Sequence, residues 1–277
     1  MSNEKKLKIA FQGEHGAYGE MAVLKIFPNS KPIPSRTFYD VFEKLRKDKV
    51  DYAVVPIENS IEGSINETYD LLIKYQIHII GEVFQHVSHC FIVNKNCDFK
   101  KIKKIYSHPQ ALAQCRKFWI NKYDEYPTYD TAGAVKMIKE LNYCDAGAIA
   151  SKRAGELYDM SIVKEGIQDT TNNFTRFLVL SKKSNQEKTG MDKTSIIFSI
   201  NHAPGSLFGI LEEFAKRNLN LTKIESRPTK ERLWEYYFFV DFEGHLKDKT
   251  VAEMFKVLKH KCKFLKILGS YKIASKD

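Results

Sequence analysis

Four polar stretches of the sequence could carry chemistry, and each adjoins a short apolar segment typical of a β-strand: the first three follow such a segment and the fourth leads into one. They are QGEHGAY (12–18), VPIENSIEGS (55–64), SHPQ (107–110) and DTTNNFTRF (169–177). The hydroxyls, amides, carboxylates, histidine and arginine in these stretches can bind an anion or exchange a proton. Because ligands of α/β proteins bind outside the carboxyl ends of strands, we expect the four stretches to converge on one site.

Each stretch also has a structural interpretation, and the residues alone leave both open. The two glycines of the first stretch suit a tight turn as well as an anion-binding loop. Asn59 or Ser60 could simply cap a helix. His108 could be an acid, a base or a structural hydrogen-bonding group. Arg176 could meet a substrate anion or form an internal salt bridge.

The elements that must position these stretches alternate between strands and helices up to about residue 182. LKIAFQG, DYAVVPIEN and FTRFLVLSK read as strands, with amphipathic helices between them, which indicates parallel α/β architecture. Residues 181–193 contain one hydrophobic side chain, Met191, and read as a linker. The order beyond the linker is βαββαβ, the ferredoxin-like pattern.

Composition narrows the class of protein. The chain has 277 residues, with 43% hydrophobic and 28% charged residues, which is ordinary for a globular protein of one or two domains. Its start lacks the apolar stretch of a secretory signal, and no apolar run has the length of a membrane helix, so we expect a cytoplasmic protein without a membrane partner. The net charge of +10 suits an anionic metabolite as well as nucleic acid. We expect no nucleic-acid partner, since the lysines do not align with stacking aromatics and no recognition helix is evident.

The cysteines are scattered, and no pair has CxxC spacing. We therefore expect reduced thiols, with neither a disulfide framework nor a metal cluster. They are Cys90, Cys97, Cys115, Cys144 and Cys262.

Together the motifs GEHGAYGE, VPIENSIEGS, SHPQALAQC and NNFTRF resemble prephenate dehydratase in their order and spacing, and PGSLFGIL and ESRP resemble the signatures of its ACT regulatory domain. The resemblance covers residues 7–275. It implies a two-lobed, periplasmic-binding-protein-like α/β catalytic domain at 1–182, with lobes at about 7–80 plus 172–182 and at 81–171. A ferredoxin-like ACT domain follows at 194–277. The chain begins directly with the dehydratase region, so we expect a monofunctional enzyme.

The resemblance implies that prephenate, a dianion, loses CO₂ and water to give phenylpyruvate in phenylalanine biosynthesis, with no metal and no cofactor. It assigns the essential hydroxyl to Thr175. We expect Arg176 to bind the carboxylate that keeps its charge, since binding the departing carboxylate would stabilise the ground state. The other residues expected around the substrate are Asn59, Ser60, Ser107, Gln110 and Thr131.

For the C-terminal region the resemblance implies that L-phenylalanine binds between two copies of the ACT domain as an allosteric effector, in a homodimer or homotetramer. The alternative to effector binding is a purely structural role, as a helix cap for residues 204–208 and as a strand-ending turn for residues 225–228. The residues expected at the effector site are Pro204, Gly205, Ser206, Leu207, Phe208, Glu225, Ser226, Arg227 and Pro228.

Three alternatives stay open to different degrees. An arogenate dehydratase would act on the substrate that carries an amino group in place of the side-chain ketone, and the sequence does not separate the two. A non-catalytic binding protein of the same fold would usually carry a secretion signal. A DNA-binding regulator would need a helix-turn-helix or a similar reader.

Overall fold

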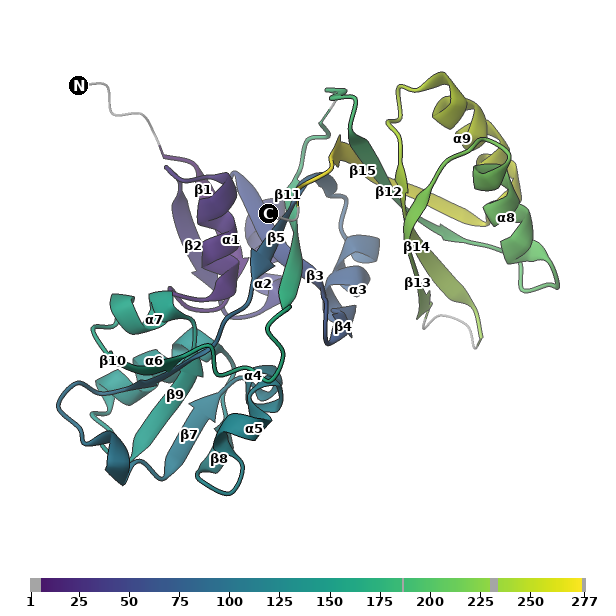
Figure 1. Ribbon diagram of the computed structural model, residues 1–277. Coiled ribbons are helices and arrows are strands. Elements are labelled where there is room, and N and C mark those ends of the chain that lie inside the picture. The colour runs from purple at the N-terminus through teal and green to yellow at the C-terminus, as the bar shows by residue number, and fades with distance from the viewer. Residues whose placement is uncertain (1–5, 186, 230–233, 276–277) are drawn as a thin grey trace, which may run out of the picture. The chain divides into compact units, whose positions relative to one another are not determined.

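The computed structural model describes residues 6–185, 187–229 and 234–275, and these residues form three β-sheets (Figure 1). The first two sheets belong to the α/β region, and the third is the four-stranded sheet of the C-terminal region. The expected fold class, two α/β lobes followed by a βαββαβ domain, is confirmed.

The first sheet has the strand order β2-β1-β3-β11-β5, with the short β4 paired to β3. β1 pairs in parallel with both β2 and β3, as the continuous apolar runs predict. Its strands are β1 (Lys8–Gln12), β2 (Lys31–Ser35), β3 (Tyr52–Asn59), β4 (Gly63–Ser64), β5 (His78–His86) and β11 (Phe174–Ser181). Its helices are α1 (Tyr18–Ile26), α2 (Phe38–Arg46) and α3 (Asn66–Lys74).

The second sheet has the order β10-β6-β9-β7-β8 and is mixed, because β6 pairs antiparallel with β9 and β10. Its strands are β6 (Cys90–Val93), β7 (Lys104–Ser107), β8 (Asp124–Pro127), β9 (Ala146–Ala150) and β10 (Ser161–Glu165). Its helical segments are η1 (Phe99–Lys101), α4 (Pro109–Gln114), α5 (Arg116–Trp119), α6 (Thr131–Glu140) and α7 (Lys152–Leu157).

Several helices of the α/β region begin at a side-chain cap. Thr37 and Asp40 form a reciprocal capping box at α2. Asp130 accepts the Gly133 N–H at the start of α6, and Ser151 accepts the Ala154 N–H at the start of α7. These caps fix where the loops between strand and helix end, and those loops carry the site.

The third sheet has the order β13-β14-β12-β15, with all pairs antiparallel. Figure 1 shows α8 and α9 side by side on this sheet, and they enclose an apolar core that includes Phe198, Phe214 and Phe242. The elements are β12 (Asp192–Ser199), α8 (Ser206–Ala215), β13 (Leu221–Pro228), β14 (Tyr236–Glu243), α9 (Lys249–Lys261) and β15 (Phe264–Lys272).

The chain divides into two compact units whose boundary differs from the expected one. Among the described residues, the first unit comprises 6–71 and 83–177, and the second comprises 72–82, 178–185, 187–229 and 234–275. Segment 72–82 therefore belongs with the C-terminal domain, and β5 and β11 each continue from one unit into the other.

Two features within the second unit attach segment 72–82 to the four-stranded sheet. Lys266 Nζ donates to the carbonyls of Leu72 and Tyr75 at 2.8 and 2.6 Å, and so satisfies carbonyl groups around the end of α3. Gly269 approaches the Ile79 carbonyl so closely that a Cβ at this position would lie 2.1 Å from its oxygen. The compact units thus divide at other points of the chain than the linker, and the domain bounds expected from the sequence stay a prediction.

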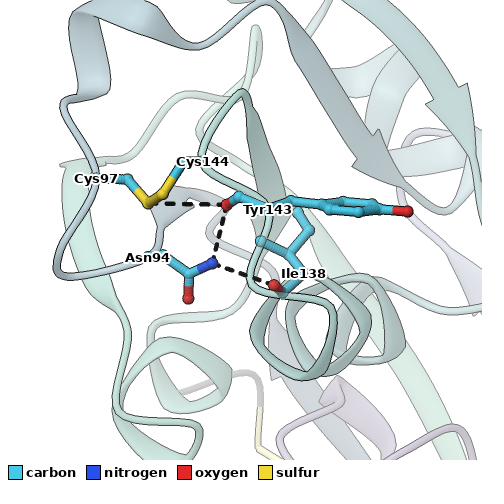
Figure 2. The surroundings of a disulfide bond; sticks show 5 residues. All are labelled: Asn94, Cys97, Ile138, Tyr143 and Cys144. Carbon is cyan, nitrogen blue, oxygen red and sulfur yellow. Dashed lines mark hydrogen bonds between the residues drawn. A yellow bond between two sulfur atoms is a disulfide. The ribbon is translucent and has the colours of Figure 1, made fainter.

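One expectation about the cysteines is wrong. Cys97 and Cys144 form a disulfide, although 47 residues separate them (Figure 2). The fold brings the loop after β6 beside the loop after α6, and Asn94 Nδ2 ties them by donating to the carbonyls of Ile138 and Tyr143 at 3.1 and 2.9 Å. The Cα atoms of the two cysteines are 5.1 Å apart, inside the usual range for a disulfide, and spacing along the sequence does not show this. Cys90, Cys115 and Cys262 are free.

Among the residues that the structure describes, no helix is long and apolar enough to cross a membrane.

Candidate functional site

A cavity of about 510 Å³ lies within the first unit, and all four of the polar stretches contribute to its wall. The convergence expected at the carboxyl ends of the strands is therefore present. The residues that line this cavity include Gln12, Tyr18, Arg36, Asn59, His89, His108, Gln110, Gln114, Asp130, Thr131, Thr175 and Phe177.

Of the seven residues expected around a substrate, four line this cavity and three do not. Asn59, Gln110, Thr131 and Thr175 form part of its wall. Thr131 is the first residue of α6, as expected, and its neighbour Asp130 caps that helix. Ser60, Ser107 and Arg176 are not among the lining residues, so any part they take in a reaction stays a prediction.

The alternation of β11 explains why Thr175 and Arg176 face different surroundings. Successive side chains of a strand point to opposite faces. Thr175 and Phe177 line the cavity, while Arg176 between them is buried and lies 3.4 Å (Nη1 to Oε1) from Glu58. This is the internal ion pair that the sequence left open as an alternative.

The two expected serines hold backbone groups. Ser107 is fully buried and donates to the Ile149 carbonyl at 2.5 Å, which ties β7 to β9. Ser60 Oγ accepts the Phe174 N–H at 2.9 Å and lies 3.3 Å from the Asn172 carbonyl. It thereby attaches the second polar stretch to the fourth.

The hydroxyl of Thr175 receives a hydrogen bond from an amide. Asn59 Nδ2 donates to Thr175 Oγ1 at 3.0 Å, and it also lies 2.7 Å from Asn173 Oδ1 and 3.2 Å from the Phe174 carbonyl. Thr175 is 9% exposed and its hydroxyl hydrogen has no acceptor among the described residues. Since the oxygen already accepts, the hydroxyl is left as a donor toward the cavity.

Three further polar side chains complete this arrangement, and none of them is among the residues expected around the substrate. Asn173 Nδ2 donates to Gln114 Oε1 at 2.9 Å, and His89 Nε2 lies 3.1 Å from the same oxygen. Gln114 sits four residues after Gln110 on the same face of α4, and that spacing is the signal that could have found it. Asn173 and His89 carry no comparable signal, because their neighbours in the network come from distant parts of the chain.

The first polar stretch joins the two lobes in addition to contributing Gln12 and Tyr18 to the cavity wall. Glu14 binds Tyr129 and Lys136 of the second lobe, at 2.8 and 3.2 Å. A Cβ on Gly16 would lie 2.8 Å from the Ala154 Cα, so only glycine permits this approach. The glycines therefore serve close packing between the lobes.

Glu20 provides the charged part of the same contact. Its buried carboxylate accepts from Arg153 Nε at 2.8 Å, from the Gly16 N–H at 2.9 Å, and lies 2.6 Å from His15 Nδ1. Burial alone would raise the pKa of Glu20, but the hydrogen bonds from Arg153, His15 and Gly16 outweigh it and hold the pKa below its ordinary value.

This pKa predicts acid sensitivity. A carboxyl whose pKa is lower in the folded than in the unfolded chain stabilises the fold above its ordinary pKa, and that stability is lost as pH falls. We expect Glu20→Gln to cost about 1–3 kcal/mol at pH 7 and to flatten the decline in unfolding free energy below about pH 4.5. Urea unfolding from pH 3 to 7 measures both effects. Equal pH slopes for the two proteins would contradict the assignment.

The cavity wall contains the guanidinium group of Arg36, and it contains His108 and Asp130, whose pKa values are shifted by burial. Arg36 is exposed, lines the cavity, and has no ion-pair partner among the described residues. Burial lowers the pKa of His108, whose Nδ1 accepts the Gln110 N–H at 3.3 Å. Burial raises the pKa of Asp130, against the backbone N–H groups of Glu14 and Gly133 that bind its carboxylate. The cavity can thus attract a carboxylate and offer hydrogen-bond donors beside it.

Comparison with known proteins assigns the family. A family model described as Prephenate dehydratase matches residues 9–185, and one described as ACT domain matches residues 194–259. The chain belongs to the prephenate dehydratase family. A relative from Arabidopsis thaliana, "Arogenate dehydratase/prephenate dehydratase 2, chloroplastic", is 41% identical to this family member over 285 residues, which covers 99% of this chain and 74% of the relative.

Solved structures of similar fold agree with the dehydratase family and also show that its fold carries other activities. A prephenate dehydratase from Arthrobacter aurescens in complex with L-Phe has a TM-score of 0.89 and 31% identity, covering 98% of this chain and 91% of that chain. GqqA, described as a novel type of quorum quenching acylase, has a TM-score of 0.88 and 30% identity, covering 96% and 98%.

In the ACT domain of this dehydratase family member, the expected effector residues fall in two places. Pro204–Phe208 lead into α8, where Gly205 is the N-cap with φ +80° and Phe208 is 69% exposed. Ser206 and Leu207 line a cavity of about 150 Å³ together with Trp234 and Tyr236. Glu225–Pro228 form the end of β13, an edge strand of the sheet, and do not line that cavity. Their part in effector binding stays a prediction.

Across the described parts of the chain, no group of three or more His, Cys, Asp or Glu side chains could hold a metal ion.

Proposed function

We propose that this protein converts prephenate into phenylpyruvate by decarboxylating dehydration, and that L-phenylalanine regulates it through the ACT domain. The observation that carries the proposal is the Thr175 hydroxyl, which faces the cavity while Asn59 Nδ2 donates to its oxygen. A hydroxyl held in this way is an oriented donor for the oxygen that leaves the ring.

The reaction takes one proton and releases CO₂ and water while the ring becomes aromatic. Aromatisation supplies the driving force, so the protein has to hold the dianion and donate to the departing hydroxyl. Thr175 is a weak acid, and its role is to bond the leaving oxygen or relay a proton to it. The carboxyl group of Asp130, whose pKa is raised by burial, lines the same cavity and accepts the backbone N–H groups of Glu14 and Gly133.

Arg36 is the cation that we assign to the side-chain carboxylate of the substrate, which keeps its charge throughout the reaction. We expect Arg36→Gln to raise KM about 10- to 100-fold with little change in kcat, because it removes an interaction of similar strength in ground and transition states. Steady-state kinetics at constant ionic strength measure this. Arg116→Gln, an exposed arginine outside the cavity lining, is the matched control. A KM for Arg36→Gln equal to that of the control would remove Arg36 from the site.

The substrate is prephenate rather than arogenate in this proposal. The two differ only at the side chain, where a keto acid replaces an amino acid, and the Arabidopsis relative carries both activities in its name. Purified protein given each substrate separately should show the larger kcat/KM with prephenate. A larger value with arogenate would assign the chain to the arogenate branch of the family and leave the dehydration chemistry intact.

Acyl transfer, the activity named for GqqA, fits the described site less well. A nucleophilic hydroxyl needs an adjacent base to take its proton. Thr175 Oγ1 accepts a hydrogen bond from the amide nitrogen of Asn59, and an amide nitrogen cannot take up the hydroxyl proton. The arrangement favours Thr175 as a donor.

Regulation by phenylalanine is proposed to act through an assembly of ACT domains. β13 is an edge strand with alternating burial, and Phe208 and Ile224 are exposed on this domain, which suits pairing with a second copy. Gly205→Val should weaken inhibition by phenylalanine at least tenfold while turnover persists, because a left-handed backbone at the N-cap disfavours a β-branched residue. Unchanged inhibition would place the effector elsewhere.

A further inference from the structure

The side-chain amides beside Thr175 form a chain of hydrogen bonds, and backbone N–H groups determine which atom of the first amide, Asn59, accepts and which donates. Asn59 Oδ1 accepts the N–H groups of Ile61 and Glu62, both at 3.0 Å. Its Nδ2 must therefore be the atom that faces Asn173 and Thr175, and it donates to both.

The orientation of Asn59 in turn determines the orientation of the Asn173 and Gln114 amides. Because Asn173 Oδ1 accepts from Asn59, Asn173 Nδ2 is the atom that faces Gln114, and it donates there at 2.9 Å. The atom of Gln114 that receives it must be the carbonyl oxygen Oε1. Gln114 Nε2 then has no partner among the described residues, and Gln114 lines the cavity, so its two N–H groups are available to a bound ligand.

The same oxygen settles the tautomer of His89. His89 Nε2 lies 3.1 Å from Gln114 Oε1, which has no hydrogen to give, so Nε2 must carry the proton. Nδ1 then carries no proton; it lies 3.2 Å from the Tyr18 hydroxyl oxygen, whose hydrogen is donated to the Ser88 carbonyl at 2.6 Å. The ring is 2% exposed and its backbone N–H is held by Gln168 Oε1 at 2.9 Å, so it has little freedom to turn.

We propose that His89 is a positioning residue for the reaction: its Nε2–H group holds the Gln114 carbonyl, so that the Gln114 NH₂ group is presented to the substrate as a donor. This rests on the proposed function. Without His89, Gln114 Oε1 keeps only the hydrogen bond from Asn173 Nδ2, so the amide is held at one point instead of two and its NH₂ group is less firmly directed at the substrate. His89 itself need not touch the substrate or exchange a proton.

The test compares three replacements of His89 in the full-length protein. His89→Leu removes the donor, His89→Gln places an amide N–H near the position of Nε2, and His89→Asn places one near Nδ1. We expect kcat to fall about 10- to 100-fold in His89→Leu and His89→Asn, and to return to within about tenfold of the wild type in His89→Gln. His260→Leu, an exposed position on α9, is the matched control.

A folded His89→Leu protein with the kcat of the control would overturn the proposal. If that variant does not fold, the comparison of His89→Gln with His89→Asn decides, because the proposal requires glutamine to be the better replacement. The tautomer is tested without substrate, by ¹⁵N NMR of the imidazole at pH 7. A neutral Nε2–H ring is expected, and an Nδ1–H ring would refute the proposal even if the wild type turns over neither substrate.

Discussion

Replacement of Thr175 by alanine should lower kcat about 10²- to 10⁴-fold, the range that a positioned proton donor contributes. The loss follows from geometry, because the Thr175 hydroxyl is the donor that Asn59 orients toward the cavity. The fold should survive, because Asn59 Nδ2 retains Asn173 Oδ1 and the Phe174 carbonyl as acceptors. Kinetics and thermal unfolding of the same preparation separate the two effects.

Thr175→Ser is the matched control for this prediction. It keeps the hydroxyl and loses only a methyl group, so its kcat should stay within about tenfold of the wild type. Equal turnover in the alanine and serine variants, at equal stability, would show that the methyl group rather than the hydroxyl matters. The assignment of the essential donor would then be wrong.

Lys193→Met should cost about 3–5 kcal/mol of unfolding free energy in the second unit, because it leaves the buried Glu82 carboxylate without its cation. Lys193 Nζ lies 3.0 and 3.1 Å from the two oxygens of Glu82, and both side chains are buried. The Ala274 N–H also binds this carboxylate at 3.2 Å. Urea unfolding at pH 7 measures the loss.

Two comparisons make this result specific. Glu82→Gln combined with Lys193→Met removes both charges and should recover most of the lost stability. Lys216→Met breaks the exposed pair with Glu212 and should cost less than about 1 kcal/mol. A Lys193→Met protein no less stable than Lys216→Met would contradict the view that segment 72–82 is anchored to the ACT domain.

The anchoring also changes how regulation should be tested. A protein cut after Lys182 would keep Glu82 but lose Lys193 and Lys266, so it would expose a buried charge and leave the end of α3 without its cap. Loss of activity in such a fragment would report unfolding. Point substitutions such as Gly205→Val keep these contacts and therefore test effector binding alone.

Much of the fold followed from the sequence because strands and helices were strongly patterned. The apolar runs predict the parallel part of the first sheet. The different order of strands and helices after residue 193 predicts the βαββαβ domain. The unit boundary did not follow, because what decides it is Lys193 and Lys266 meeting segment 72–82 from far along the chain. The polar composition of residues 181–193 predicts a linker, but it does not predict which distant segments the neighbouring residues contact.

At the site, the sequence located the loops better than the individual side chains. Thr175 and Arg176 were both expected at a substrate, but a strand directs neighbours to opposite faces, and Arg176 pairs with Glu58. The alternation of side chains along a strand already implies that only one of these two neighbours can face the cavity. Asn173 lies in the fourth polar stretch, but its role and that of His89 depend on hydrogen bonds to residues between 25 and 114 positions away, which the sequence does not show.

The most direct test of the proposed chemistry is the turnover of prephenate by the purified full-length chain at neutral pH. Phenylpyruvate is followed by its absorbance in alkali, and CO₂ is measured in parallel. We expect one CO₂ for each phenylpyruvate, at a rate far above the spontaneous reaction, and a rate about 10²- to 10⁴-fold lower in Thr175→Ala. Aromatic product no faster than in the absence of protein, with arogenate equally unreactive, would contradict the proposed function.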